Sequence, residues 1–270
     1  MHILIATDGS PESDLAVRLG EAVATITNGS LTLLIVIKHE TERTQAESIL
    51  IRTKTLIPEH VSLQTKIRVG QTAEEIVREV AANNHHLVII GEESQRWLTS
   101  RLLAPTVERV ISQLPCPVLV ARGEIRPLRR VLVCESGRDP SLLNRLINQL
   151  SPLLRKVDKL TALHVMSQMA AAPGVRGWEL RASANELMEK HTVEGSFLES
   201  DLARLAKLNV DLEAKVRHGL VVREILDEMQ SGDYDLVVIG AHQGKGWERF
   251  LLDDLAHEII SQADRPLLVV

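Results

Sequence analysis

The chain has 270 residues, of which 44% are hydrophobic and 2% aromatic, and it carries a formal net charge of −5. That length suffices for one large domain or for two domains of ordinary size. Acidic and basic residues are mixed in both halves, and aromatic residues are few, so the composition excludes a basic nucleic-acid surface and a stacking platform for single strands.

The apolar segments are short, and none approaches the roughly 20 residues that span a bilayer. The N-terminus has no secretory pattern, because the chain runs from Met1 directly into a strand-like segment. Cys116 and Cys134 are the two cysteines, too few for a disulfide framework. We therefore expect a cytoplasmic protein that has neither a membrane nor a nucleic acid as its partner.

The first half alternates short apolar segments with segments of helical spacing. Ser10, followed by Pro11, predicts the start of a helix, and Thr72 with Glu75 predicts a capping box at the start of another. The pair His85 and His86 predicts a surface turn. Strands rich in Val, Ile and Leu are predicted at residues 2–7, 31–38, 63–69, 87–91 and 117–122.

The second half repeats this alternation after a break around Gly123–Arg129. A loop at Ala170–Gly174 is followed by a helical stretch over about Trp178–Leu208, which we expect to be broken near Gly195. Strands are predicted at residues 130–135, 158–166, 210–218, 235–240 and 266–270.

An internal repeat relates the two halves. Leu87–Gly91 returns as Leu236–Gly240 at an offset of 149, whereas Leu34–Val36 matches Leu163–Val165 at an offset of 129. The second copy therefore has an insertion of about 20 residues after its second strand. We assign residues 1–125 to one domain and residues 126–270 to a second domain that contains the insertion.

Strand–helix alternation with nearly continuous apolar strands is typical of α/β proteins. We predict two tandem doubly wound parallel sheets, each with five strands and with helices on both faces. The crossovers between parallel strands are expected to be right-handed.

Three motifs give the chain a family likeness. The first copy resembles the universal stress protein family in three places: Ile5–Ser10 after the first strand, Gly91 at the end of the fourth, and Pro115–Val120. The resemblance extends over essentially the whole chain, once in each copy. The resemblance implies the strand order 3-2-1-4-5. It also implies an ATP site in many members, built on a loop that reads Gly, two residues, Gly, nine residues, Gly, then Ser or Thr. Glycines in such a loop let backbone N–H groups approach phosphates.

In the first copy the loop positions are eroded. The resemblance places Gly91, Ser94, Ala104 and Pro105 at the four positions, so one glycine of three remains. Pro105 has neither an N–H group nor a hydroxyl, and Glu92 adds negative charge. Asp8, which contacts the nucleoside in the family, is retained. Asp8, Gly91 and Ser94 are the candidate binding residues here, although Asp8–Ser10 is equally consistent with an ordinary turn and helix cap.

In the second copy Ser136 stands at the Asp8 position, and Gly240, Gln243, Asp253 and Asp254 stand at the loop positions. Two carboxylates in place of the Gly-Ser pair would repel a triphosphate. Polar residues still gather at the predicted carboxyl ends of the strands, where ligands bind in open sheets. The candidate residues for an unknown ligand are Ser136, His164, Gly240, His242, Asp253 and Asp254.

Cys134, His164, His218, His242 and the two aspartates are residue types that bind zinc, but they form no ligand pair at short spacing. We therefore predict no metal and no cofactor. Triad and metalloprotease motifs are absent from the sequence, so no catalytic residue is assigned. The expected function is that of a non-enzymatic stress or regulatory protein with an unidentified protein partner or small ligand.

Two alternatives stay open. The first is an ATP-binding or slowly ATP-hydrolysing switch that uses the first copy. The second is a carrier or sensor of another small ligand that uses the second copy.

The fifth strands of the copies, Pro117–Val120 and Pro266–Val269, are apolar and would have open edges if unpaired. Single-domain members of the resembled family commonly dimerise through this strand. We predict that the two strands pair antiparallel within the chain around a pseudo-twofold axis, in a monomer or a homodimer.

Overall fold

The computed structural model describes residues 1–92, 105–135, 142–167, 177–240 and 254–270. The described residues form two compact α/β units. The first unit takes in the described parts of Met1–Pro127 together with Asp264–Val270, and the second takes in those of Leu128–Gly240 and of Asp254–Ala263. The break between Pro127 and Leu128 lies in the segment where we expected one copy to end.

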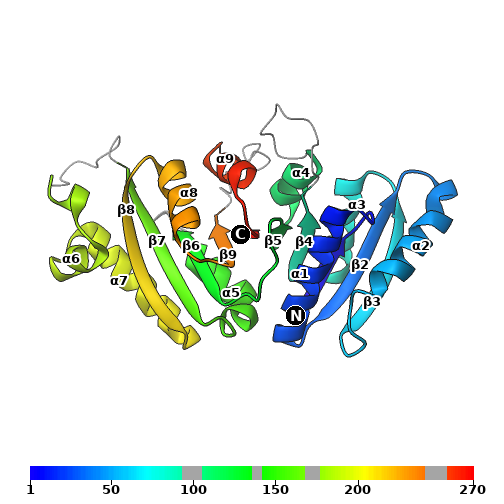
Figure 1. The fold of residues 1–270 in the computed structure, drawn as a ribbon, viewed down its shortest axis with the longest axis horizontal. Coiled ribbons are helices and arrows are strands. Elements are labelled where there is room, and N and C mark those ends of the chain that lie inside the picture. The colour runs from blue at the N-terminus through cyan, green and yellow to red at the C-terminus, as the bar shows by residue number, and fades with distance from the viewer. Residues whose placement is uncertain (93–104, 136–141, 168–176, 241–253) are drawn as a thin grey trace. The chain divides into compact units, whose positions relative to one another are not determined.

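The sheet of the first unit has the strand order β3-β2-β1-β4-β5-β10. Its first five strands are all parallel, which confirms the order 3-2-1-4-5 for the first copy (Figure 1). The strands are β1 (His2–Ala6), β2 (Ser30–Ile37), β3 (Ser62–Val69), β4 (Leu87–Gly91), β5 (Val118–Ala121) and β10 (Leu267–Val269).

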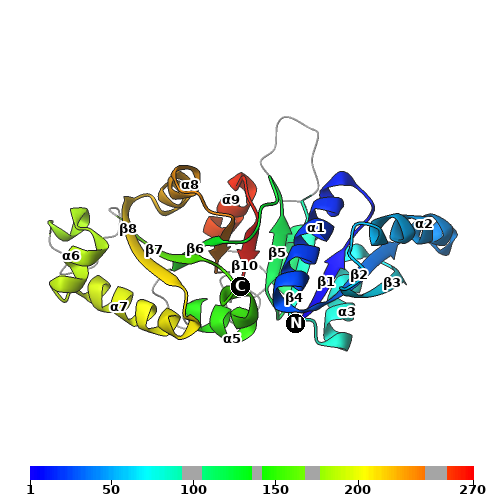
Figure 2. The same ribbon diagram turned by 60° about the horizontal axis from the view of Figure 1, so that its bottom comes forward.

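Helices cover both faces of this sheet (Figures 1 and 2). Right-handed crossovers place α1 and α2 on one face and α3 and α4, which pack on each other, on the opposite face. Ser10 caps α1 as expected, because its Oγ accepts the Ser13 N–H at 3.2 Å. The helical elements are α1 (Pro11–Thr27), η1 (Glu40–Glu42), α2 (Arg43–Lys54), α3 (Thr72–Asn83) and α4 (Pro105–Gln113).

Helix α3 corrects the predicted capping box. The residue at its N-cap is Gln71, which makes no side-chain cap, and Thr72 is the first helical residue. Glu75 binds Arg68 and Arg78. Arg68, on the strand before the helix, and Arg78, within the helix, therefore attract the carboxylate away from the helix N-terminus.

The sheet of the second unit has the order β9-β6-β7-β8, with all neighbours parallel. This confirms the predicted order for the first four strands of the second copy. The strands are β6 (Arg130–Glu135), β7 (Lys159–Ser167), β8 (Asp211–Gly219) and β9 (Leu236–Ile239). The helical elements are α5 (Leu142–Leu154), η3 (Glu179–Arg181), α6 (Ala184–Glu189), α7 (Val193–Leu205), η4 (Ala206–Leu208), α8 (Val221–Ser231) and α9 (Asp254–Gln262).

The described part of the inserted segment forms η3 and α6, and the loop predicted at Ala170–Gly174 lies outside the described residues. The break before α7 is earlier than we expected. It lies around His191, whose φ is +48°, and Thr192 then caps α7 by accepting the Gly195 N–H at 2.9 Å. Gly195 is needed for packing, because a Cβ there would lie 2.1 Å from the Leu187 carbonyl oxygen of α6. The glycine therefore permits close helix contact, and the αL turn at His191 makes the break.

The fifth strand predicted for the second copy, β10, pairs antiparallel with β5, with Leu268 opposite Leu119. The predicted pairing of the two fifth strands is thus confirmed. Because of this pairing, β10 belongs to the first compact unit. Both Leu119 and Leu268 are fully buried, so the pair contributes core as well as backbone hydrogen bonds.

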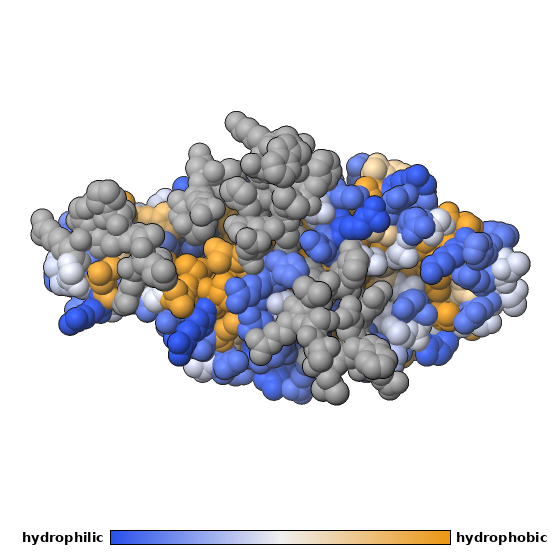
Figure 3. Space-filling view, turned by 90° about the horizontal axis from the view of Figure 1, so that it is seen from above, coloured by the Kyte–Doolittle hydropathy of each residue, from blue (hydrophilic) through white to orange (hydrophobic). Residues whose placement is uncertain are grey.

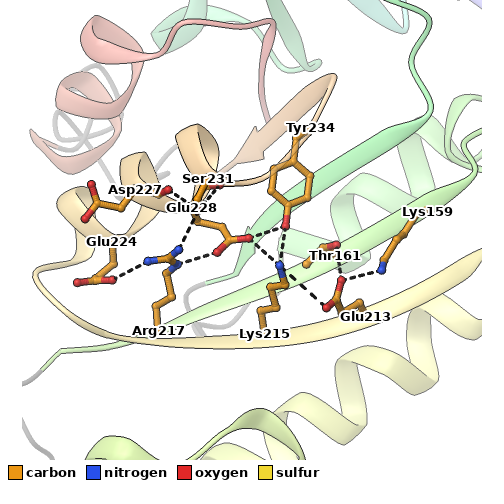
Figure 4. Close-up of polar contacts among 10 residues, drawn as sticks. All are labelled: Lys159, Thr161, Glu213, Lys215, Arg217, Glu224, Asp227, Glu228, Ser231 and Tyr234. Carbon is orange, nitrogen blue, oxygen red and sulfur yellow. Dashed lines mark hydrogen bonds and ion pairs between the residues drawn. The ribbon is translucent and has the colours of Figure 1, made fainter.

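Each unit buries a matching ion network between its third strand and the following helix. In the second unit the carboxylate of Glu228 accepts hydrogen bonds from Lys215 at 3.0 Å, Arg217 at 2.7 Å and the Tyr234 hydroxyl at 2.6 Å (Figure 4). In the first unit Glu79 binds Lys66 and Arg68 at the equivalent positions. The network is therefore a repeated feature of the fold.

His85 occupies the position of Tyr234 in the first network, which corrects the expectation of a surface turn. Its side chain is buried, with Nε2 3.5 Å from Oε1 of Glu79, whereas His86 is exposed. Burial lowers the pKa of His85, so the imidazole is neutral near pH 7.

On the face seen in Figure 3, hydrophilic residues predominate among the described ones, and apolar residues gather in patches between them. The exposed large apolar side chains of the described residues are Ile51, Val69, Val193, Leu220 and Leu255. Within the described part of the chain, no helix combines the length and the hydropathy needed to cross a bilayer.

Candidate functional site

The candidate site of the first copy lies at the carboxyl end of β1. Asp8 accepts the Ser10 N–H at 2.9 Å. Burial opposes ionisation of this carboxyl, but hydrogen bonds from Ser10 and Ser13 outweigh it and hold the pKa of Asp8 below its usual value. Asp8 is therefore an anion that completes the turn before α1, and its exposed side chain still faces solvent.

Thr7 and Ser13 complete this turn. Thr7 Oγ1 accepts the Gly9 N–H at 3.2 Å and donates to Ser13 Oγ at 3.0 Å. Gly9 has a φ of +81°, and a Cβ there would lie 2.8 Å from Ile49. Turn geometry therefore accounts for the Thr-Asp-Gly-Ser run without a ligand.

Gly91, the one loop glycine retained in the first copy, has a packing role. A Cβ at this position would lie 2.3 Å from the carbonyl oxygen of Glu12, in the first turn of α1. The glycine thus lets α1 approach the end of β4. Its presence is explained by the fold and is not evidence for phosphate binding.

The charge of Glu92 is balanced within the first copy. Its carboxylate forms an ion pair with Arg122, whose side chain is 5% exposed. Burial raises the pKa of Glu92 and lowers that of Arg122. Pro105 is the first residue of α4, so that position lacks one of the N–H donors a helix start normally offers. Ser94 and Ala104 lie outside the described residues.

In the second copy a carboxylate replaces Thr7. Glu135 ends β6, is 4% exposed, and accepts the Leu143 N–H at 3.1 Å. Its carbonyl oxygen lies 3.4 Å from Nδ1 of His164, whose ring contacts Phe197 with the centroids 5.5 Å apart. Burial lowers the pKa of His164, which is therefore neutral near pH 7.

Gly240 follows β9 in a looser environment than Gly91. A Cβ there would lie 3.6 Å from a guanidinium nitrogen of Arg145, an ordinary contact distance. Arg145 Nε is buried without a hydrogen-bond partner, and burial lowers the pKa of this guanidinium. An arginine side chain thus stands beside this glycine, where the first copy has the backbone of α1.

The remaining predicted residues of the second copy are only partly described. Ser136, His242 and Asp253 lie outside the described residues, and Asp254 is the first residue of α9. His218 donates Nε2–H to the Ala182 carbonyl at 2.9 Å, and its buried Nδ1 has no partner. Within the described residues, no group of three His, Cys, Asp or Glu side chains could hold a metal ion.

Neither cysteine has the features of a reactive thiol. Burial raises the pKa of Cys116 to about 11, and burial raises the pKa of the partly buried Cys134 as well. A thiol that stays protonated is a poor nucleophile.

Sequence reasoning missed three residues of the second copy: Glu135, Arg145 and Asp201. Glu135 had a signal, because a charged residue closes an apolar strand where the first copy has threonine. Asp201 had a weaker one, since it lies three residues after Leu198 and four before Leu205 on the buried face of α7. Polar residues on an apolar helix face are the signal to look for.

The model of a known protein family matches both halves of the chain. The universal stress protein family model covers residues 1–122 and again residues 127–270. The chain belongs to the universal stress protein family. Two family copies in tandem explain the repeat, the shared strand order and the duplicated ion network.

Individual relatives of this universal stress protein are distant. A universal stress protein of Mycolicibacterium smegmatis is 22% identical, with 99% of this chain and 96% of that protein aligned. Universal stress protein E of Photorhabdus laumondii is 23% identical over 73% of this chain, and the match spans 65% of the relative's length. A universal stress protein of Archaeoglobus fulgidus has a similar structure, with a TM-score of 0.73, 16% identity, and 99% of this chain and 97% of that chain covered.

Proposed function

We propose that this chain is a non-enzymatic regulatory member of the universal stress protein family that does not hold ATP in the manner the family loop implies. Residues 1–125 and 126–270 act as two copies of one domain in this proposal. Its regulatory output is transmitted through a protein partner or a small ligand of unknown identity.

One observation carries the proposal: the two described residues that the first copy retains from the family site, Asp8 and Gly91, already have roles in the fold. Asp8 accepts the Ser10 N–H, and Gly91 makes room for the Glu12 carbonyl. Pro105 supplies no N–H at the start of α4. Phosphate binding depends on free backbone donors at a helix N-terminus, so the proline opposes it, and the fold accounts for the two retained residues without a nucleotide.

The second copy is even less suited to a triphosphate. Glu135 adds a buried carboxylate at the end of β6, in addition to Asp253 and Asp254 in the loop sequence. Arg145 supplies one cation beside Gly240. A ligand that binds at this edge of the sheet would therefore carry both a positively and a negatively charged group. This favours a carrier or sensor of a different small molecule as the alternative function of the second copy.

Isothermal calorimetry with ATP and Mg²⁺ tests the main proposal. We expect no binding tighter than about 100 µM, which corresponds to about −5.5 kcal/mol. ATP that survives purification, or a lower dissociation constant, would contradict it. A phosphate-release assay is expected to give equal rates for the wild type and Asp8→Ala, and turnover lost in that variant would support the ATP-switch alternative.

A thermal-shift screen with nucleotides and small metabolites separates the two alternatives. A ligand at 100 times its dissociation constant adds about 2.7 kcal/mol of stability, a readily measured shift. Stabilisation by ATP that is lost in Asp8→Ala would support the switch in the first copy. Stabilisation by another compound that is lost in Arg145→Gln would support the carrier in the second copy.

A further inference from the structure

Asp201 is a carboxylate buried in the second copy with one oxygen unpaired. It lies on α7, and its side chain is 1% exposed. Oδ1 accepts a hydrogen bond from Arg204 at 3.2 Å, whereas Oδ2 is buried and has no hydrogen-bond partner. An ionised carboxylate in this position loses its hydration without full compensation.

Asp201 is the charged member of an otherwise apolar helix face. Helix α7 buries Gly195, Leu198, Asp201 and Leu205. This face packs against α5, α6, β7 and β8. The helix therefore docks through a surface that contains one ionisable group at its centre.

A second carboxylate, at the end of β6, acts on Asp201. Glu135, at the end of β6, is 4% exposed, and its negative charge disfavours ionisation of Asp201, while Arg204 opposes this effect. Titratable groups also lie on the elements packed against this helix: His164 on β7, His218 on β8, Arg145 on α5 and Glu186 and Glu189 on α6. Burial lowers the pKa of His164, and the guanidinium of Arg145 interacts with the charge of Glu135.

We propose that Asp201 and Glu135 form a buried proton-binding site that controls the docking of α7 on the sheet of the second copy. A proton on Asp201 Oδ2 removes one of two neighbouring negative charges and so removes the penalty for burying α7. Loss of that proton leaves two buried carboxylates with Arg204 as the paired cation of Asp201. The ligand of this site is thus a proton, and the element that responds is α7 together with the inserted helix α6 that packs on it.

The pKa of Asp201 sets the pH range in which the site loses its proton. Burial, followed by the charge of Glu135, raises this pKa from 3.8 to about 7. A raised carboxyl pKa means that the folded protein keeps the proton after the unfolded chain has lost it. The resulting stability is complete below about pH 4, decreases as the pH rises towards 7, and is lost above that value.

The described residues of the first copy contain no counterpart of this site on the equivalent helix. Its helix α2 buries Ala46, Leu50 and Thr53, none of which ionises in this range. Residue 7, which corresponds to Glu135, is threonine. Proton binding therefore distinguishes the second copy from the first, and the inserted segment lies in the copy that responds.

Asp201→Asn tests the proposal, because asparagine has the same shape and does not titrate. Between pH 6 and pH 8 the unfolding equilibrium constant of the wild type is expected to rise about tenfold more than that of the variant. Urea unfolding at both pH values measures this difference, and other titrating groups cancel between the two proteins. Asp227→Asn, at a half-exposed position on α8, is the matched control and should follow the wild type.

Two further measurements keep the test independent of global unfolding. Hydrogen exchange of Val193–Leu205, corrected for intrinsic rates, should accelerate from pH 6 to pH 8 in the wild type and not in Asp201→Asn. Carboxyl ¹³C NMR should show Asp201 titrating near pH 7, with a lower midpoint in Glu135→Gln. The proposal is overturned if Asp201 titrates below about pH 5, or if wild type and Asp201→Asn have the same pH dependence.

Discussion

The Tyr234 hydroxyl donates a 2.6 Å hydrogen bond to Oε1 of Glu228, in the position where the first copy has His85 beside Glu79 (Figure 4). The tyrosine thus completes the ion network of the second copy. Burial would raise the pKa of Glu228, but the hydrogen bonds from Tyr234, Arg217 and Lys215 lower it.

Tyr234→Phe removes one donor and leaves the two cations in place. We expect a loss of about 1.5–3 kcal/mol in the free energy of unfolding, the usual contribution of a hydrogen bond to a charged group. Urea unfolding at pH 7 measures the loss. Ser261→Ala, which removes an exposed hydroxyl bonded to a helix carbonyl, is the control and should cost less than about 0.5 kcal/mol. Equal losses of stability in the two variants would show that the Tyr234 hydroxyl stabilises the protein no more than an exposed hydroxyl does.

Glu79→Gln tests the network of the first copy and its pH dependence. Burial opposes ionisation of Glu79, but Lys66, His85 and Arg68 lower its pKa below the usual value. A depressed carboxyl pKa stabilises the fold above the ordinary glutamate range, and this stability is lost as the pH falls through the folded-state pKa.

At pH 7 Glu79→Gln should therefore destabilise the protein by about 2–3 kcal/mol, because Lys66 and Arg68 lose the carboxylate that they share. The loss is limited because both cations are partly exposed to solvent. The gap between wild type and variant should narrow below about pH 4. Thermal unfolding at pH 7 and pH 3.5 measures both gaps. A gap that stays constant with pH would contradict an ionised Glu79.

Gly91→Ala and Gly240→Ala form a matched pair. At Gly91 the new Cβ would collide with the Glu12 carbonyl at 2.3 Å, whereas at Gly240 the nearest atom is 3.6 Å away. We expect Gly91→Ala to cost about 2 kcal/mol or more, and Gly240→Ala to lie within about 0.5 kcal/mol of the wild type. Chemical denaturation of both variants tests this, and equal stabilities would refute a packing role for Gly91.

Truncation before Leu267 tests the pairing of β10 with β5. It removes three residues that pair with β5 and exposes the edge of that strand. Because β10 is buried in the first compact unit, we expect loss of stability in that unit and association through the open edge. Light scattering and thermal unfolding measure these effects. A stable, monomeric truncated protein would contradict the arrangement.

Much of the fold could be predicted from the sequence. Apolar runs such as Leu87–Gly91 located each strand to within about two residues, because buried parallel strands need continuous apolar side chains. The repeat at an offset of 149 located the second sheet and the insertion. The antiparallel pair Leu119 and Leu268 could be predicted because apolar strand edges need partners.

The tertiary structure alone decided which polar residues are buried and what they contact. The sequence indicated that Gly91 remains, but only the approach of the Glu12 carbonyl shows its packing role. His85 and His86 cannot be told apart from the sequence, yet His85 is buried beside Glu79 whereas His86 is exposed. Asp201 and Glu135 are 66 positions apart, and their electrostatic coupling exists only because α7 folds back over the sheet. Periodicity reports the face of an element, whereas burial and charge coupling depend on what packs against that face.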